Sequence, residues 1–251
     1  MRSADLISRS AAVGAAALAA AGLSACVSTQ TKNARTLLVN ARTLDSESRV
    51  RVTAPNADVT VSGVQLIRSR GGIAVAVTVT NTSRHPVSDL PISVGLRSRA
   101  HATAYLNGAA NLPYFATHIA GIGASASTVW VFTTRHAPRD AGAAGLRAFA
   151  VVGDAVKPAS TGATALPRLT ASASNAGAAG QLHVSVENPS GVPQFELPVY
   201  AVAIRDGRIV GAASGSIGEL DGGSHTHLRL TLLGTTTGAT VQLAVPPTIF
   251  N

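Results

Sequence analysis

Two parts of the chain carry the same pattern of alternating apolar residues, 107 positions apart. In each part, apolar residues occupy every second position up to an asparagine, and a Leu-Pro pair begins nine positions later. Alternation with a period of two is typical of β-strands that bury one face. The matching positions are Val75, Val77, Val79, Asn81, Leu90 and Pro91 in the first part, and Leu182, Val184, Val186, Asn188, Leu197 and Pro198 in the second. The pattern therefore predicts two copies of one β-strand unit.

A second block extends the repeat at an offset of 98 positions. It matches Ile119, Ile122, Trp130 and Phe132 with Ile217, Leu220, Leu228 and Leu230. Few stretches after Leu23 show the apolar period of a helix, and turn-forming residues recur throughout. We therefore expect an all-β fold with two tandem immunoglobulin-like or fibronectin-like β-sandwiches. The first would occupy residues 57–154 and the second 167–251, with a linker at 155–166.

Several repeated residues have predictable structural roles. Asn81 and Asn188 are expected to end their strands, because an asparagine side chain bonds to nearby backbone and tolerates a left-handed turn. Pro91 and Pro198 cannot donate a hydrogen bond within a sheet, so we expect them at a strand start or on a sheet edge. Trp130 occupies an alternating position and is expected to fill the first core, with ligand stacking as the alternative.

The second copy contains three turns in a defined order. An asparagine-containing turn at 187–191 is followed by Asp206-Gly207 and by a Leu-Asp-Gly-Gly turn at 220–223. Asp-Gly is a strong signal for a two-residue β-hairpin, because glycine accepts a positive φ. In this order the segment resembles the FxLYD-type bacterial immunoglobulin-like domains, although residues 203–206 read Ala-Ile-Arg-Asp where the family has an aromatic residue and Leu-Tyr-Asp. The resemblance implies a non-catalytic module of the cell envelope.

The amino terminus has the organisation of an export signal. Two arginines in the first ten residues precede an uncharged, alanine-rich run of 13 residues at 11–23. This run is shorter than the roughly 20 apolar residues of a membrane-spanning helix, and it fits a secretory signal. It leads into the quartet Leu23-Ser24-Ala25-Cys26, which resembles the lipobox of bacterial lipoproteins.

The lipobox resemblance implies that a signal peptide, residues 1–25, is cut off immediately before Cys26 and that the Cys26 thiol receives diacylglycerol. Residues 26–56 would then form the lipidated end and a tether. An ordinary signal cut near Ala25 is the alternative. Cys26 is the only cysteine, so no intramolecular disulfide can form. We expect an extracytoplasmic protein held on the bacterial cell membrane by acyl chains such as palmitate.

No sequence motif indicates catalysis or a cofactor. His225 and His227 would share one face of a strand, but no Cys, Asp or Glu pattern beside them supplies further metal ligands. The chain lacks the Gly-x-Ser-x-Gly elbow of a serine nucleophile. Neither Gly71-Gly72 nor Gly222-Gly223 precedes a predicted helix that could hold phosphate. We therefore expect no enzyme activity, no catalytic residues, no metal and no cofactor.

The chain is basic, with 20 Lys and Arg against 12 Asp and Glu and a net charge of +8. Five arginines make the first unit locally basic: Arg68, Arg70, Arg84, Arg97 and Arg99. They are candidate contacts for an anionic partner such as lipid headgroups or a wall polymer, and solvated surface charge is the alternative. Nucleic acid is not expected as a partner of an exported protein.

Two functions fit these features. The first is a membrane-anchored cell-envelope lipoprotein that acts as a non-catalytic interaction or scaffold module, with an envelope protein as its partner. The second is a binder of anionic cell-wall polymer or carbohydrate through the Arg-rich first domain. Lipid on Cys26 would support the first function, and arginine-dependent retention on an anionic polymer would support the second.

Overall fold

The computed structural model describes residues 51–98, 102–135, 145–155, 166–175 and 180–249. The predicted signal peptide, Cys26, most of the tether and linker, and Arg99 lie outside these residues. Within them, all paired strands are antiparallel, and the one helical element is the 3₁₀ turn η1 at Tyr114–Ala116. The predicted all-β fold is confirmed. No helix in this part of the chain is long and apolar enough to cross a membrane.

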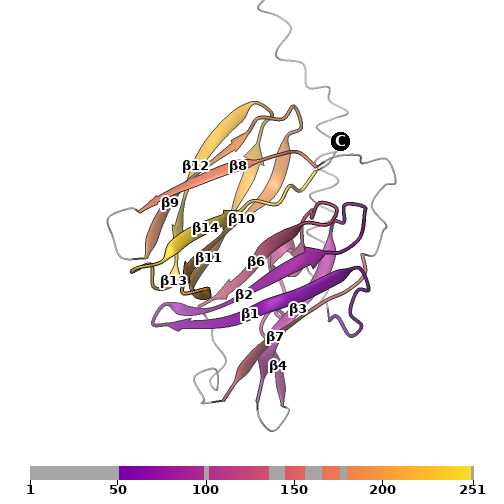
Figure 1. Cartoon of the computed structure of the whole chain (residues 1–251), viewed down its shortest axis with the longest axis vertical. Helices are drawn as coiled ribbons and strands as arrows, with labels where there is room; N and C mark the ends of the chain where they lie inside the picture. The colour runs from indigo at the N-terminus through magenta and orange to yellow at the C-terminus, as the bar shows by residue number, and fades with distance from the viewer. Residues whose placement is uncertain (1–50, 99–101, 136–144, 156–165, 176–179, 250–251) are drawn as a thin grey trace, which may run out of the picture. The chain divides into compact units, whose positions relative to one another are not determined.

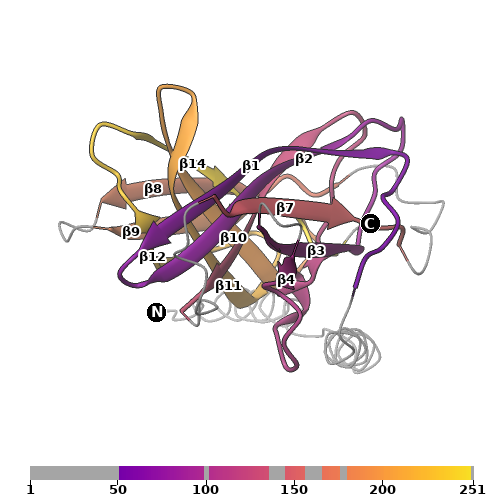
Figure 2. The same cartoon turned by 90° about the horizontal axis from the view of Figure 1, so that it is seen from below.

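The described residues up to 155, here called the first half, form two sheets. One has the order β1-β2-β6 and consists of β1 (Val59–Ser69), β2 (Gly72–Asn81) and β6 (Ser127–Thr134). The other is built on β3 (Leu90–Arg97), which pairs with β4 (Thr103–Tyr105), β5 (His118–Ile119) and β7 (Arg147–Val152). Figure 2 shows β7 running beside β3. Both sheets contribute to one buried cluster, which includes Val75, Trp130 and Ile92.

The described residues from 166 onward, here called the second half, form two further sheets. One has the order β13-β11-β10-β14 and consists of β13 (Leu233–Gly234), β11 (Arg208–Leu220), β10 (Gln194–Arg205) and β14 (Thr240–Ala244). The other has the order β12-β9-β8 and consists of β12 (Ser224–Thr231), β9 (Gln181–Asn188) and β8 (Thr170–Asn175). These sheets share a second buried cluster, which includes Val184 and Leu197.

No sheet of the described residues mixes strands from the two halves, and Figure 1 shows the purple to magenta strands gathered apart from the orange to yellow ones. Each half therefore has a β-sandwich-like arrangement. The immunoglobulin-like topology and the domain bounds remain predictions.

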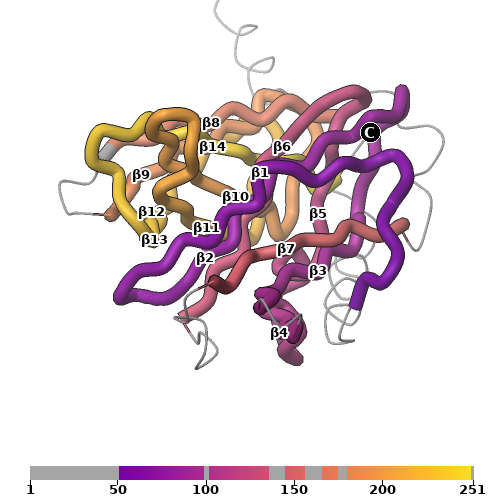
Figure 3. The backbone as a smooth tube through the Cα atoms, turned by 60° about the horizontal axis from the view of Figure 1, so that its bottom comes forward, coloured from indigo at the N-terminus to yellow at the C-terminus, as the bar shows by residue number. Residues whose placement is uncertain are grey.

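Side chains nevertheless join the two halves. Tyr200, Val202, Ala212 and Leu233 of the second half belong to the buried cluster of the first. In Figure 3 the β1–β2 hairpin lies beside β11 and β13. This packing buries β2 on both faces, so the prediction that its alternation marks a single buried face is wrong for this strand.

The two repeated asparagines hold equivalent loops in place. As predicted, β2 ends at Asn81 and β9 ends at Asn188, and both side chains are fully buried. Each Nδ2 donates to three backbone carbonyls. These belong to His85, Ile122 and Gly123 (2.7, 3.5 and 2.9 Å) for Asn81, and to Val192, Leu220 and Asp221 (2.8, 3.3 and 3.2 Å) for Asn188. The partners are themselves related by the offsets of 107 and 98, so the repeat extends to individual hydrogen bonds.

The left-handed backbone lies elsewhere than predicted. The described non-glycine residues with positive φ do not include Asn81 or Asn188. They do include Asp89 and Glu196, with φ of 53° and 50°, which are again 107 positions apart. The asparagines therefore end their strands with the side chain alone, by bonding loop carbonyls, and the turn in the backbone comes eight residues later.

The predicted Asp-Gly hairpin is confirmed. Strands β10 and β11 pair up to Arg205 and Arg208, which leaves Asp206 and Gly207 as a two-residue loop. Their φ angles of 52° and 71° are those of a type I′ turn, whose twist matches that of the flanking strands.

Both repeated prolines lie where a sheet does not need their missing N–H. Pro91 is the second residue of β3. Pro198 lies in a stretch of β10 that pairs with β11 only, because pairing with β14 begins at Tyr200. The prediction of a strand start or a sheet edge is confirmed for both.

Candidate binding groove

Two adjoining cavities lie where β6 of the first half packs against β11 of the second. Both are lined by Thr133 of β6 and by Ser214, Gly215 and Ser216 of β11. The Thr133 and Ser214 hydroxyls hydrogen-bond to each other across this junction at 2.8 Å. We call the pair the junction groove, which consists of an aromatic cavity of about 420 Å³ and a basic cavity of about 930 Å³.

The aromatic cavity is lined mainly by apolar side chains. Four of them are aromatic: Tyr114 and Phe115 of η1, Phe132 of β6 and Tyr200 of β10. These residues are themselves largely buried, with 2–7% of their surface exposed. Pro113 starts the 3₁₀ turn with a φ of −55°, and this turn places Tyr114 and Phe115 next to each other on the cavity wall.

Two buried side chains fix this wall. The indole N–H of Trp130 donates to the carbonyls of Phe115 and His118, at 3.2 Å each. The Tyr200 hydroxyl donates to the same Phe115 carbonyl at 3.5 Å. Burial raises the pKa of the Tyr200 hydroxyl, so this group remains a neutral donor. Residues of β6 and β10 thus hold one backbone position of η1 from both halves.

The basic cavity gathers three arginines from separate elements. Arg70 lies in the β1–β2 turn, Arg135 directly follows β6, and Arg229 lies on β12. All three are exposed, and none forms an ion pair with another described residue. The described residues that line this cavity include threonine and serine hydroxyls but no acidic side chain. The cavity is therefore suited to an anion.

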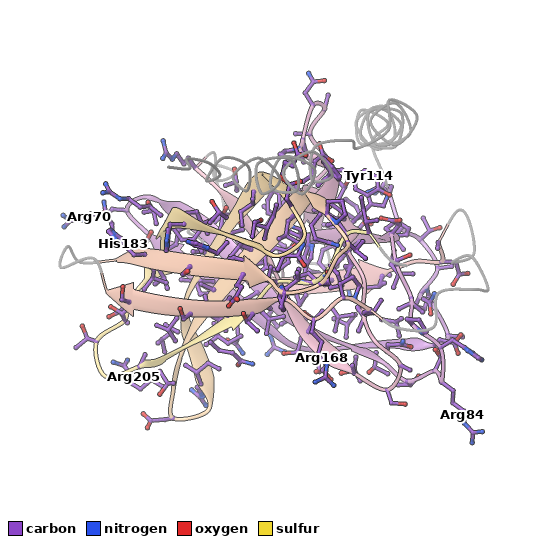
Figure 4. The ribbon with its side chains drawn as sticks, turned by 90° about the horizontal axis from the view of Figure 1, so that it is seen from above. Arg70, Arg84, Tyr114, Arg168, His183 and Arg205 are labelled. Carbon is purple, nitrogen blue, oxygen red and sulfur yellow. The ribbon has the colours of Figure 1, made fainter. Side chains whose placement is uncertain are left out.

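The structure does not bring the predicted arginines together. Arg68 and Arg70 lie at the β1–β2 hairpin, whereas Arg84 lies in the loop after β2 and Arg97 ends β3. Strand β2 spans ten residues, so its two ends are about 30 Å apart. Figure 4 accordingly shows Arg70 and Arg84 at opposite ends of the view. Of these four described arginines, only Arg70 lines the basic cavity.

Arg135 and Arg229 were not predictable as site residues. Neither lies in a basic run of the sequence, and Arg229 reads simply as an exposed position of an alternating strand. Only the packing of the second half on the first brings both to the cavity that Arg70 lines.

Arg97 belongs to a different surface feature. Its guanidinium lies 5.2 Å from the ring centroid of Phe149, and that of Arg51 lies 4.5 Å from the ring centroid of Tyr105. The two rings meet edge to face at 5.6 Å, and both residues pair with Gly95 of β3. We call these four side chains the arginine–aromatic patch. Both rings are partly exposed, and each has a guanidinium group over it.

The two histidines of β12 share one exposed face, as their spacing predicts. The rings of His225 and His227 meet edge to face with centroids 5.7 Å apart. His225 pairs with Glu187 of β9. In the described part of the chain, no three His, Cys, Asp or Glu side chains are arranged to hold a metal ion.

No family model matches this chain, and no curated protein matches it. Among solved structures, the chain is similar to the exo-chitosanase CsxA of Amycolatopsis orientalis, at 15% identity and a TM-score of 0.25, over 75% of this chain and 26% of that one. A variant of that enzyme in complex with PNP-β-D-glucosamine gives 14% identity and a TM-score of 0.24, over 76% and 26%. This chain thus spans about a quarter of the enzyme's length. At these TM-scores the similarity carries no functional argument.

Proposed function

We propose that this chain is a membrane-anchored lipoprotein of the cell envelope whose β-sandwich-like part acts as a non-catalytic interaction module. The observation that carries the proposal is the quartet Leu23-Ser24-Ala25-Cys26, directly after an apolar run of 13 residues. Each buried CH₂ of an acyl chain contributes about 0.8 kcal/mol to membrane binding, so two or more chains on Cys26 would anchor the protein stably.

The interaction role is supported by what the repeated residues do. Asn81 and Asn188 use their side chains to bond loop carbonyls, and Trp130 fills a core. The repeated residues therefore have structural roles, as expected of a scaffold, and none of these roles is that of a reaction centre. The resemblance of the second copy to non-catalytic envelope domains supports the same role.

Replacing Cys26 by serine is expected to abolish lipid attachment, because the hydroxyl of serine does not replace the thiol that receives diacylglycerol. We expect the unaltered protein to incorporate labelled palmitate and to partition into the membrane fraction. The Cys26→Ser protein should remain unlabelled and should keep its signal peptide. The measurements are palmitate labelling in cells, membrane fractionation, and the mass of the amino-terminal peptide.

A Ser28→Ala variant is the matched control, because it changes a neighbouring hydroxyl and leaves the quartet intact. It should be labelled and cleaved normally, and its cleavage should be sensitive to globomycin. If the Cys26→Ser protein is still cut after Ala25 and still membrane-bound, the lipid anchor is wrong.

Binding of an anionic wall polymer or carbohydrate is a second candidate function. The observation that favours it is the arginine–aromatic patch, because sugar rings stack on aromatic faces and guanidinium groups pair with carboxylates or phosphates. We expect the protein to be retained on immobilised polygalacturonate at low salt and released at high salt.

An Arg51→Gln/Arg97→Gln variant should lose this retention, because it removes both cations and leaves the rings in place. An Arg84→Gln/Arg208→Gln variant has the same net charge and is the control, since neither arginine belongs to the patch. Equal retention of the two variants, or no retention at any salt concentration, would exclude the patch as a polymer site.

A further inference from the structure

The two cavities of the junction groove differ in chemistry and share a wall. Thr133, Ser214, Gly215 and Ser216 line both, so the aromatic cavity and the basic cavity adjoin along this wall. One cavity can take an apolar group and the other an anionic group. A single ligand that carries both groups would fill the groove along its length.

We propose that the junction groove binds an amphipathic anion, with its apolar body in the aromatic cavity and its carboxylate or phosphate group in the basic cavity. This site goes beyond the proposed function and does not depend on the lipid anchor. It uses residues of both halves, so it exists only where they pack together.

Charge complementarity supports the anionic end. Arg70, Arg135 and Arg229 are all among the residues that line one cavity, and its described lining includes no acidic side chain. An anion there would be attracted by the positive charge of these arginines. Guanidinium groups also match the geometry of carboxylate and phosphate oxygens, which they bind through two parallel hydrogen bonds.

The size and lining of the aromatic cavity support the apolar end. Its volume of about 420 Å³ is within the range of small-molecule sites. Gly218 of β11 lines it and leaves it open, because a Cβ at this position would have no heavy atom within 4 Å. An alkyl chain or a ring can therefore enter beside Gly218.

Glu196 fixes the orientation of the ligand. It lines the aromatic cavity and is absent from the lining of the basic one. Its neighbours Phe195 and Leu197 pair with Glu219 and Ile217, so Glu196 lies level with Gly218, beyond the shared residues. The acidic residue of the groove therefore lies at the end away from the arginines, which leaves the arginine end for the anionic head of the ligand.

Three probes separate the contributions of head and body: octyl phosphate, 1-octanol and inorganic phosphate. The protein is the full-length Cys26→Ser chain in buffer without detergent, so that no attached acyl chain competes. Trp130 is the only tryptophan, and its indole bonds the Phe115 carbonyl on the cavity wall. Its fluorescence should report occupation, with titration calorimetry giving the affinity. We expect octyl phosphate to bind at least about tenfold more tightly than either partial probe.

Two variants test the two ends. Arg70→Gln/Arg135→Gln/Arg229→Gln should weaken octyl phosphate about tenfold or more and leave 1-octanol unchanged. Its control is Arg84→Gln/Arg168→Gln/Arg208→Gln, which removes the same charge at positions that line neither cavity.

Gly218→Leu should block both octyl probes by filling the aromatic cavity. Its control is Gly191→Leu, another glycine whose added Cβ meets nothing within 4 Å. All four variants should melt within a few degrees of the parent protein, since the changes are at exposed positions.

Three results would overturn the proposal. The first is octyl phosphate affinity no higher than that of inorganic phosphate. The second is an equal loss in the two triple-arginine variants, which would mean attraction by overall charge. The third is unchanged binding in Gly218→Leu. None of these results bears on lipid attachment to Cys26, so the two proposals fail separately.

Discussion

Replacing Asn188 by alanine is expected to lower the free energy of unfolding by about 3–5 kcal/mol, a large effect for one polar side chain. The side chain is fully buried and holds the carbonyls of Val192, Leu220 and Asp221. Its Oδ1 also accepts from the N–H and the hydroxyl of Ser190. Alanine leaves these groups without their partner, and each buried group so left costs about 1–3 kcal/mol. Chemical denaturation followed by circular dichroism measures the loss.

Gln181→Ala is the matched control, because it removes an exposed amide from the same strand, β9. It should change the free energy of unfolding by no more than about 0.5 kcal/mol. Asn81→Ala should cost nearly as much as Asn188→Ala, since four of the five corresponding hydrogen bonds are present in the first half. Similar values for Asn188→Ala and Gln181→Ala would contradict the structural role of the repeated asparagines.

The sequence repeat predicted that β2 and β9 are equivalent strands, because equivalent strands need the same kinds of side chain to face a core. The alternating pattern of β9 matches its alternating burial residue by residue. The Asp206-Gly207 turn was predictable for a local reason, since few dipeptides accept positive φ at both positions. Features that depend on one strand and its turn could therefore be predicted from the sequence.

The packing of the two halves against each other could not be predicted from the sequence. Ala74 and Ala76 alternate with valines in β2 and read as the open face of a strand, yet both are fully buried. The alanine side chain is a single methyl group that gains little from burial, so alanine at alternate positions does not say whether a face is covered. Ala212 and Leu233 of the second half lie in the same buried cluster as these alanines.

The basic cavity could not be predicted from the sequence either, because it also depends on how the two halves pack together. Arginines close in sequence were expected to act together, but a ten-residue strand separates Arg70 from Arg84. The partners of Arg70 in the basic cavity, Arg135 and Arg229, come from distant strands. A site at a junction between two sheets is defined by which faces meet, and a single sequence does not encode that in any local pattern.

Trp130→Ala is expected to lower the free energy of unfolding by about 3–5 kcal/mol, because it leaves a large cavity where the halves meet. The side chain is fully buried, with the rings of Phe132 and Tyr200 each 6.4 Å away between centroids. Its loss also leaves the Phe115 and His118 carbonyls without the indole donor. Urea unfolding followed by circular dichroism measures the effect, since the variant has no tryptophan.

Trp130→Phe separates the two causes, because it keeps an aromatic ring in the core and removes only the donor and part of the volume. It should cost about 1–3 kcal/mol, clearly less than alanine. Since Tyr200 of the second half packs on Trp130, the alanine variant should also weaken the cohesion of the halves. Unfolding that is a single transition in the parent protein should then separate into two, or shift as a whole if one half cannot fold without the other. A loss in Trp130→Ala no greater than that in Trp130→Phe would mean that the ring does not hold the junction together.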